Sequence, residues 1–217
     1  MTQKLLTEFV GTLLFLFAIS AAVLTGTPMA PLAIGGALMV MVYMGGHVSG
    51  AHYNPAVSLA ILIRGNMPAN ELIAYWIAQI LSALVGCFLA SLATGKTFAV
   101  MPGENVGAAA ALVVEVVFTF ALALVVLNAA PGKPTAGNSF YGLAIGFTMV
   151  VAAFAGGGIS GGAFNPAVAT GAALNSVLHG QGAGPLWIYW VGPLLGGVLA
   201  AGTFKVQHPG DCSKRGV

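Results

Sequence analysis

The sequence predicts an all-α membrane protein with six transmembrane helices and two shorter re-entrant half-helices. Of its 217 residues, 58% are hydrophobic and only 6% are charged, whereas a soluble domain carries about 25% charged residues. Residues 9–63 and 134–204 contain no Asp, Glu, Lys or Arg. Because a helix needs about 20 apolar residues to cross a bilayer, the chain has room for about six such spans.

The spans are separated by turns rich in proline and glycine, such as Gly26-Thr27-Pro28, Pro102-Gly103 and Pro131-Gly132-Lys133-Pro134. The predicted spans cover residues 4–26, 31–48, 70–93, 106–130, 138–157 and 184–206. We interpret the first as a membrane helix and not as a signal peptide, because no cleavage-like site ends it and further spans follow.

Two more apolar segments, residues 54–64 and 165–176, are too short to cross a bilayer at about 1.5 Å of helix rise per residue. We therefore expect them to be re-entrant half-helices. Small residues recur every four positions in two of the spans, which predicts close helix packing in lipid. These positions are Ala78, Ser82, Gly86 and Ala90 in one span and Gly192, Gly196 and Ala200 in the other.

The two halves of the chain resemble each other. Residues 49–57 match residues 160–168 at six of nine positions, at an offset of 111 residues, and Glu8 and Thr12 are echoed by Glu115 and Thr119. Three spans per half is an odd number, so the second half must be inverted relative to the first. We expect one domain over residues 1–217 with inverted repeats at about 1–93 and 106–206, and a site at their interface in mid-membrane.

Basic residues predict the orientation in the membrane. Six alternating spans put six basic residues on one side, namely Lys4, Arg64, Lys133, Lys205, Lys214 and Arg215, and only Lys96 on the other. By the positive-inside rule, both termini and a polar tail at 207–217 should be cytoplasmic in a multi-pass protein of the cell membrane. The lipid bilayer is thus one expected partner. The scattered basic residues form no cluster of the kind that binds nucleic acid.

Each half contains Asn-Pro-Ala at the start of its half-helix, Asn54-Pro55-Ala56 and Asn165-Pro166-Ala167. Asn is a favoured N-cap and Pro suits the first helical position, so one copy alone would be read as an ordinary cap. Inversion brings the two helix N-termini together at the membrane centre, where each carries about half a positive charge. With the Asn oxygen used in capping, we expect both amide hydrogens to remain as donors for a passing water molecule, which disfavours proton transfer.

The segments before the two motifs should be extended and line the pathway with backbone carbonyls, since non-helical backbone at this depth is tolerated only when buried or next to a wet cavity. The residues expected to supply these carbonyl acceptors are Gly50, Ala51, His52, Tyr53, Gly161, Gly162, Ala163 and Phe164. His47 and His52 have no Cys or acidic neighbour, so no metal site is expected. Loop packing or lining of the pathway fits them better, with pH gating by His47 as an alternative.

Together, the run Thr7-Glu8-Phe9-Val10-Gly11-Thr12, the two Asn-Pro-Ala motifs and Leu186-Trp187-Ile188-Tyr189-Trp190 resemble the aquaporin, or major intrinsic protein, family over essentially the whole chain. The resemblance implies an aquaporin-like right-handed bundle, a homotetramer with one pore per subunit, and passive conduction of water or small neutral solutes. It implies neither an enzyme nor a cofactor. In this family the equivalents of Glu8 and Glu115 brace the re-entrant loops by accepting backbone hydrogen bonds.

The sequence departs from the family at the outer constriction of the pore. Relatives usually carry Arg directly after the second motif, where this chain has Val168, and the other constriction positions fall on Ile34, Ala153 and Gly162. All four are apolar, which predicts a wider filter without charge. Glycerol facilitators of the family have Asp where this chain has Ala169, so that position resembles water channels instead. Our hypothesis is a pore for water and small neutral solutes, with glycerol, urea, ammonia and hydrogen peroxide as candidates.

Two other functions compete with the channel. An ion-coupled secondary transporter also uses inverted repeats and broken helices, but it needs cation ligands or a titratable relay near the midplane, where this chain offers two Asn residues and backbone. An intramembrane enzyme needs a nucleophile with a base or a metal. Ser49 and Ser160 have no acid or metal partner that would complete such a site.

Overall fold

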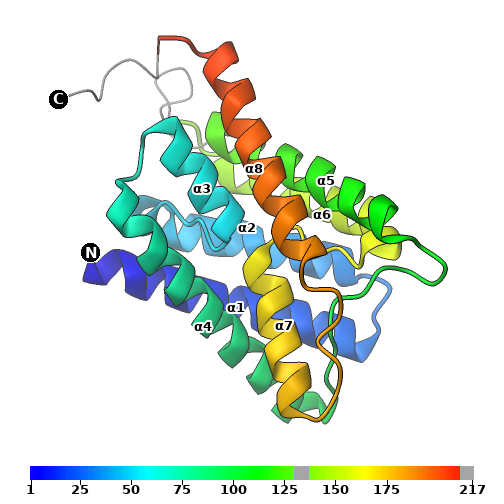
Figure 1. Cartoon of the computed structure of the whole chain (residues 1–217). Coiled ribbons are helices and arrows are strands. Elements are labelled where there is room, and N and C mark those ends of the chain that lie inside the picture. Colours follow the sequence, from blue (N-terminus) through cyan, green and yellow to red (C-terminus); the bar gives the residue numbers. More distant parts are fainter. Residues whose placement is uncertain (130–136, 211–217) are drawn as a thin grey trace.

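The computed structural model describes residues 1–129 and 137–210, and these residues form α-helices and no strand (Figure 1). The eight described helices are α1 (Thr2–Thr25), α2 (Ala30–Ser49), α3 (Pro55–Arg64), α4 (Ala69–Thr94), α5 (Ala108–Ala129), α6 (Tyr141–Ser160), α7 (Pro166–Leu178) and α8 (Ile188–Gln207). The predicted all-α fold class is therefore confirmed.

Six of these helices have the length of a membrane span. Helices α1, α2, α4, α5 and α6 are long and apolar enough to cross a bilayer. Helix α8 is as long as α2, with 20 residues, but Pro193, Lys205 and its two N-terminal aromatic residues lower its hydropathy. The half-helices α3 and α7 have 10 and 13 residues, which correspond to only about 15 and 20 Å.

Small residues let the long helices pack closely, α1 against α4 and α5 against α8. A Cβ atom on Gly86 would lie 2.6 Å from the carbonyl oxygen of Leu13, and one on Gly196 would lie 2.6 Å from that of Val116. Backbone atoms cannot move aside as a flexible side chain can. The small-residue stripes predicted from the sequence thus lie where two helix backbones meet.

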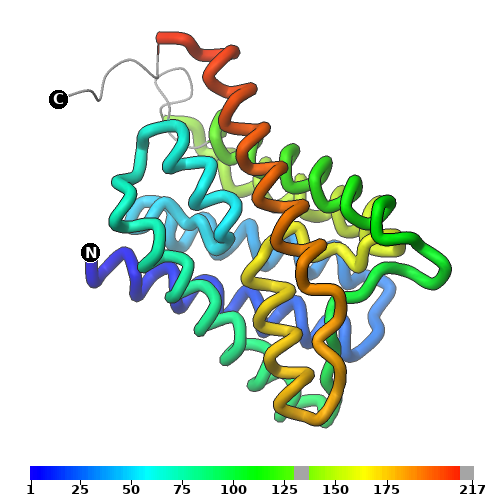
Figure 2. The backbone as a smooth tube through the Cα atoms, in the orientation of Figure 1, coloured from blue at the N-terminus to red at the C-terminus, as the bar shows by residue number. Residues whose placement is uncertain are grey.

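The two half-helices enter the bundle from opposite ends and meet near its middle, as the tube in Figure 2 shows for α3 in cyan and α7 in yellow. The long helices surround this meeting point. The centre of the bundle is therefore built from two helix N-termini and from the two loops that precede them.

The described N-terminus and the end of α8 lie at the same end of the bundle (Figure 1). There, Lys4 Nζ is 3.1 Å from a Glu71 oxygen of α4, and Arg64 Nη1 donates to the Leu127 carbonyl at 2.8 Å. Lys96 lies at the opposite end, where its Nζ donates to the Leu24 carbonyl at 3.4 Å. Three residues used in the orientation argument, Lys133, Lys214 and Arg215, fall outside the described residues, as does most of the predicted tail.

Two predicted spans differ from the observed helices by three or four residues. The span expected at 138–157 runs from Tyr141 to Ser160. Gly156 lies inside this helix and serves packing, since a Cβ there would lie 2.9 Å from Val114 on α5. The span expected from residue 184 begins at Ile188. Gly184 has a φ of +71°, a left-handed conformation that cannot start a right-handed helix.

Candidate functional site

The two Asn-Pro-Ala motifs cap the half-helices in the same way. Asn54 has extended backbone, and its Oδ1 accepts a hydrogen bond from Ala56 N at 2.9 Å. Asn165 repeats this geometry with Ala167 N, also at 2.9 Å. In both helices the following proline occupies the first turn, where no intrahelical partner for its nitrogen is needed. The cap expected from local sequence is therefore present twice.

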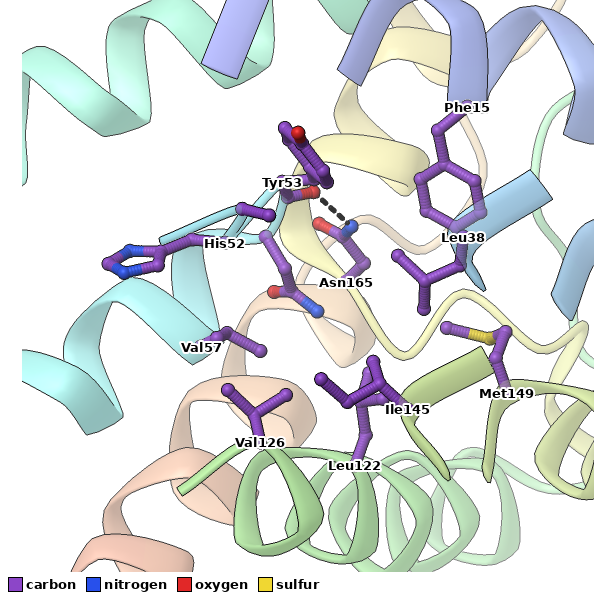
Figure 3. Close-up of a pocket in the computed structure, with 12 residues that line it drawn as sticks. Phe15, Leu38, His52, Tyr53, Val57, Leu122, Val126, Ile145, Met149 and Asn165 are labelled. Atoms are coloured by element: carbon purple, nitrogen blue, oxygen red, sulfur yellow. Dashed lines mark hydrogen bonds between the residues drawn. The ribbon is translucent and has the colours of Figure 1, made fainter. Parts of the chain in front are cut away.

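The amide nitrogens of the two Asn residues cross between the halves. Asn54 Nδ2 donates to the Phe164 carbonyl at 2.9 Å, and Asn165 Nδ2 donates to the Tyr53 carbonyl at 2.9 Å, as the dashed line in Figure 3 marks. Each amide thus has one N–H left over, where the sequence argument expected two. The reason is tertiary, since the acceptor of each amide belongs to the other half of the chain.

The loops before the motifs are not extended, contrary to the expectation from sequence. They contain left-handed residues at matching positions, Gly50, Ala51 and Tyr53 in the first half and Gly161, Gly162 and Phe164 in the second, with φ between +47° and +89°. A positive φ is uncommon for residues other than glycine and stores strain. Ala51, Tyr53 and Phe164 must therefore be held in place by other contacts.

Two fully buried carboxylates supply those contacts. Glu8 Oε1 accepts from Ser49 Oγ at 2.7 Å and from His52 N at 2.9 Å, and its Oε2 accepts from Tyr53 N at 2.8 Å. The N–H group of Tyr53 is thus turned toward the carboxylate, while its carbonyl group faces the other half of the chain and accepts from Asn165.

Glu115 does the same for the second loop. Its Oε1 accepts from Ser160 Oγ at 2.8 Å and from Ala163 N at 3.0 Å, and its Oε2 accepts from Phe164 N at 2.6 Å. Two tyrosines complete the match, since Tyr75 donates to the Ser49 carbonyl and Tyr189 to the Ser160 carbonyl, at 2.8 and 2.6 Å. The two loops are thus fixed by equivalent groups.

A small cavity of about 10 Å³ lies beside the two Asn residues, which is about the space that one water molecule needs. Apolar side chains from four long helices surround it, namely Phe15, Leu38, Leu122, Val126, Ile145 and Met149 (Figure 3). Val57 and the Ala51–Asn54 loop complete its lining. The Asn amides are therefore fixed donors in a largely apolar chamber.

A second cavity of about 320 Å³ opens toward the end of the bundle that holds Arg64. Its lining is more polar and includes His47, Ser49, Asn66, Asn138 and Tyr141. We call it the vestibule. Three residues line both the vestibule and the small cavity, His52, Val126 and Ile145. Metal binding has no support here, since the described part of the chain holds no group of three or more His, Cys, Asp or Glu suited to it.

The cavity-lining residues of the long helices follow a spacing of four. On α2 the lining passes from Leu38 at the small cavity to Val42 and Gly46 at the vestibule. On α6 it passes from Met149 through Ile145 to Tyr141. Sequence reasoning missed these residues, because a helix that is apolar on every side gives no sign of which face lines a pore. The spacing becomes visible only once one lining residue is known.

The four expected filter residues line neither of the two cavities. Ile34 and Ala153 each lie four residues from a lining residue, Leu38 and Met149, which is about 6 Å further along the same helix faces. They lie away from the vestibule, on helices that pack directly together: a Cβ on Gly35 would clash with the Val150 side chain. Gly162 is half-buried in its loop and Val168 is 3% exposed in α7.

A six-span bundle in which two half-helices meet beside a cavity the size of one water molecule has the form of a membrane channel. The sequence model described as "Major intrinsic protein" matches residues 1–204. The chain is 37% identical to aquaporin TIP1-2 of Zea mays, with 94% of this chain and 85% of the relative covered. It is 38% identical to aquaporin-8 of Mus musculus, with 91% and 78% covered.

Among solved structures, the fold is similar to that of the aquaglyceroporin from Plasmodium falciparum, with a TM-score of 0.85 and 22% identity over 96% of this chain and 97% of that one. The chain belongs to the major intrinsic protein family. It is accordingly a passive channel for water and small solutes and not an enzyme, and these similarities do not favour the alternative of an ion-coupled transporter.

Proposed function

We propose that the pore of this channel passes between Asn54 and Asn165 and admits small neutral solutes as well as water. The observation that carries the proposal is the cavity of about 10 Å³ beside the two Asn amides, in line with the vestibule along α2 and α6. The carbonyl groups of the loops 50–53 and 161–164 provide acceptors along this path, and Glu8 and Glu115 brace the loops.

Ion exclusion follows from the same centre. Two helix N-termini meet there, and each carries about half a positive charge, which raises the energy of a proton or cation. Each Asn keeps one N–H for a solute, so a water molecule would accept from both amides with its oxygen. Its hydrogens then point away along the pore, which interrupts a chain of proton transfer.

The outer filter sets the range of solutes. Ile34, Ala153, Gly162 and Val168 carry no charge, Ala153 and Gly162 are very small, and Val168 stands where relatives usually have Arg. Glycerol, urea, ammonia and hydrogen peroxide are therefore candidates beside water. The position of Ile34 and Ala153, one turn beyond the small cavity on facing helices, supports their assignment to this filter.

We further propose that the protein is a homotetramer in the cell membrane with both termini and the 207–217 tail in the cytoplasm. The homotetramer rests on the family resemblance. The orientation is supported by Lys4, Arg64 and Lys205, which lie at one end of the bundle with Lys96 at the other. The matched braces and caps support one channel domain built of inverted repeats at about 1–93 and 106–206.

Light scattering of proteoliposomes tests the solute range. After an inward glycerol gradient is applied, the initial shrinkage reports water efflux and the later reswelling reports glycerol entry. We expect both phases to be faster than in empty liposomes. Fast shrinkage with reswelling as slow as in empty liposomes would instead define a channel that excludes glycerol, and slow shrinkage in both preparations would contradict water conduction.

A further inference from the structure

Three residues line both the small cavity and the vestibule, namely His52, Val126 and Ile145. We call the passage that they border the neck. They come from three different elements, the loop before α3, α5 and α6. Two of the three are aliphatic. The only hydrogen-bonding side chain of the neck is the imidazole of His52, which points away from Phe15 and Met149 in Figure 3.

A chain of buried polar groups holds this imidazole. Ser58 Oγ lies 3.0 Å from His52 Nδ1 and 3.0 Å from Gln79 Nε2, and Gln79 Nε2 also donates to Glu8 Oε2 at 2.9 Å. Ser58 and Gln79 are fully buried. On the other side, the ring of Tyr75 packs against the imidazole with 5.0 Å between the ring centres. The orientation of the His52 ring is thus fixed by three elements.

The same chain favours one position of the proton on the ring. An amide nitrogen only donates, so the Ser58 hydroxyl accepts from Gln79 and keeps its own hydrogen available for His52 Nδ1, which lies 3.0 Å away. When Ser58 donates to Nδ1, the hydrogen of the neutral imidazole is on Nε2. This edge faces the vestibule side, because a Cβ built on the vestibule residue Gly50 would lie 3.0 Å from Nε2.

The second half of the chain has no equivalent. At the offset of 111 residues, Ala163 stands for His52 and Ala169 for Ser58. Counted from the matching Tyr75 and Tyr189, Pro193 stands for Gln79. The donor is therefore present on one side of the Asn pair only, and the apolar outer filter on the other side does not replace it.

We propose that His52 is a solute-selecting residue of the pore, which presents a fixed N–H donor and the bulk of its ring at the neck, and that Ser58 and Gln79 are its positioning residues. The inference rests on the proposed path through both cavities. A solute in the neck meets one donor opposite two aliphatic side chains. Selection by hydrogen bonding thus takes place at the vestibule end of the pore. The apolar outer filter, at the other end, provides no side-chain donor.

The ratio of glycerol to water permeability in proteoliposomes tests this proposal, because the ratio does not depend on how many channels are folded. We expect His52→Ala to raise the ratio about tenfold, because the variant removes the ring that narrows the neck, and size discrimination by a pocket is commonly of this order. Ser58→Ala should raise the ratio less, since the His52 ring remains and loses only its hydrogen bond to the Ser58 hydroxyl. Ser58→Thr, which keeps the hydroxyl, should leave the ratio as in the unaltered protein. His179→Ala, at a histidine outside both cavities, should leave the ratio unchanged.

A His52→Ala channel that conducts water with the original ratio would overturn the proposal. If this variant gives no folded protein, the original ratio in Ser58→Ala overturns it instead. The wider solute range is tested separately by the unaltered protein: if that protein excludes glycerol but His52→Ala admits it, the proposed solute range fails while the role of His52 stands.

Discussion

The two halves of the channel hold their loops and half-helices with equivalent groups, but they differ in the buried polar side chains that contact these groups. In both, a buried glutamate, a serine and a tyrosine fix a left-handed loop, and an asparagine caps the half-helix. Behind the first loop, the chain His52–Ser58–Gln79 continues from Glu8. Behind the second, Ala163, Ala169 and Pro193 occupy the equivalent positions.

This difference separates what builds the pore from what the pore selects. The shared groups all satisfy backbone atoms that would otherwise be buried without partners, a requirement that both halves meet in the same way. The groups found in one half only satisfy side chains, so the fold does not demand them twice. Evidence for selectivity should therefore be sought where the halves differ, and evidence for stability where they agree.

The largest expected effect concerns the two braces. In Glu8→Gln, replacing either carboxylate oxygen by an amide nitrogen leaves two donors without an acceptor, at about 1.5–3 kcal/mol for each bond to a charged group. Glu115→Gln can keep the oxygen that serves Ser160 and Ala163 and loses only Phe164 N. We expect Glu8→Gln to lower the free energy of unfolding about twice as much, measured by thermal unfolding in detergent.

Glu104→Gln, at an exposed loop residue, is the matched control and should leave stability unchanged. Equal losses in the free energy of unfolding for Glu8→Gln and Glu115→Gln would show that the hydrogen bond from Gln79 to Glu8 adds no stability.

The next effect concerns close helix packing, where the halves should agree. Gly86→Ala and Gly196→Ala each push a methyl group against backbone atoms of the facing helix, and overpacking of this kind costs about 1–3 kcal/mol. We expect both variants to unfold at lower temperature by similar amounts. Gly202→Ala on α8, with open space around its Cβ, should not. Tolerance of either change would contradict the close approach of the two helix backbones at that glycine.

The outer filter offers a smaller effect that distinguishes the halves by function. Val168→Arg should cut glycerol permeability about tenfold, as size discrimination by a pocket commonly does, while water permeability changes little. Val57 is the equivalent residue of the first half and lines the small cavity, which holds about one water molecule. Val57→Arg should therefore lower both the glycerol and the water permeability. Stopped-flow light scattering measures the two rates. Unchanged glycerol entry in Val168→Arg would argue against the filter assignment.

The smallest expected effect lies at the two tryptophans. Trp76 Nε1 donates directly to the Pro55 carbonyl at 3.0 Å. Trp190 Nε1 donates at 3.0 Å to Thr170 Oγ1, which itself donates to the Pro166 carbonyl at 2.7 Å. Trp76→Phe should therefore cost about 1 kcal/mol, and Trp190→Phe less, because Thr170 keeps its bond. Thermal unfolding compares the two, and a larger loss in Trp190→Phe would reverse this order.

Local features of the sequence sufficed for much of the fold. The length of each apolar run and the Pro and Gly breaks predicted the spans and the half-helices, because hydropathy and helix termination depend on neighbouring residues. The exceptions lie where packing intervened. The span predicted to end at residue 157 continues to Ser160 in α6, where Gly156 packs against Val114 and Phe118 of α5.

For the site, the sequence by itself determined the caps, since an Asn followed by Pro defines a helix start through bonds to its own backbone. Only the tertiary structure decided which group accepts a hydrogen bond from the amide nitrogen of each Asn. The acceptor lies about 110 positions away in the sequence, at the Phe164 carbonyl for Asn54 and at the Tyr53 carbonyl for Asn165. The same holds for the left-handed loops and the neck at His52, Val126 and Ile145, which exist only where separate elements meet.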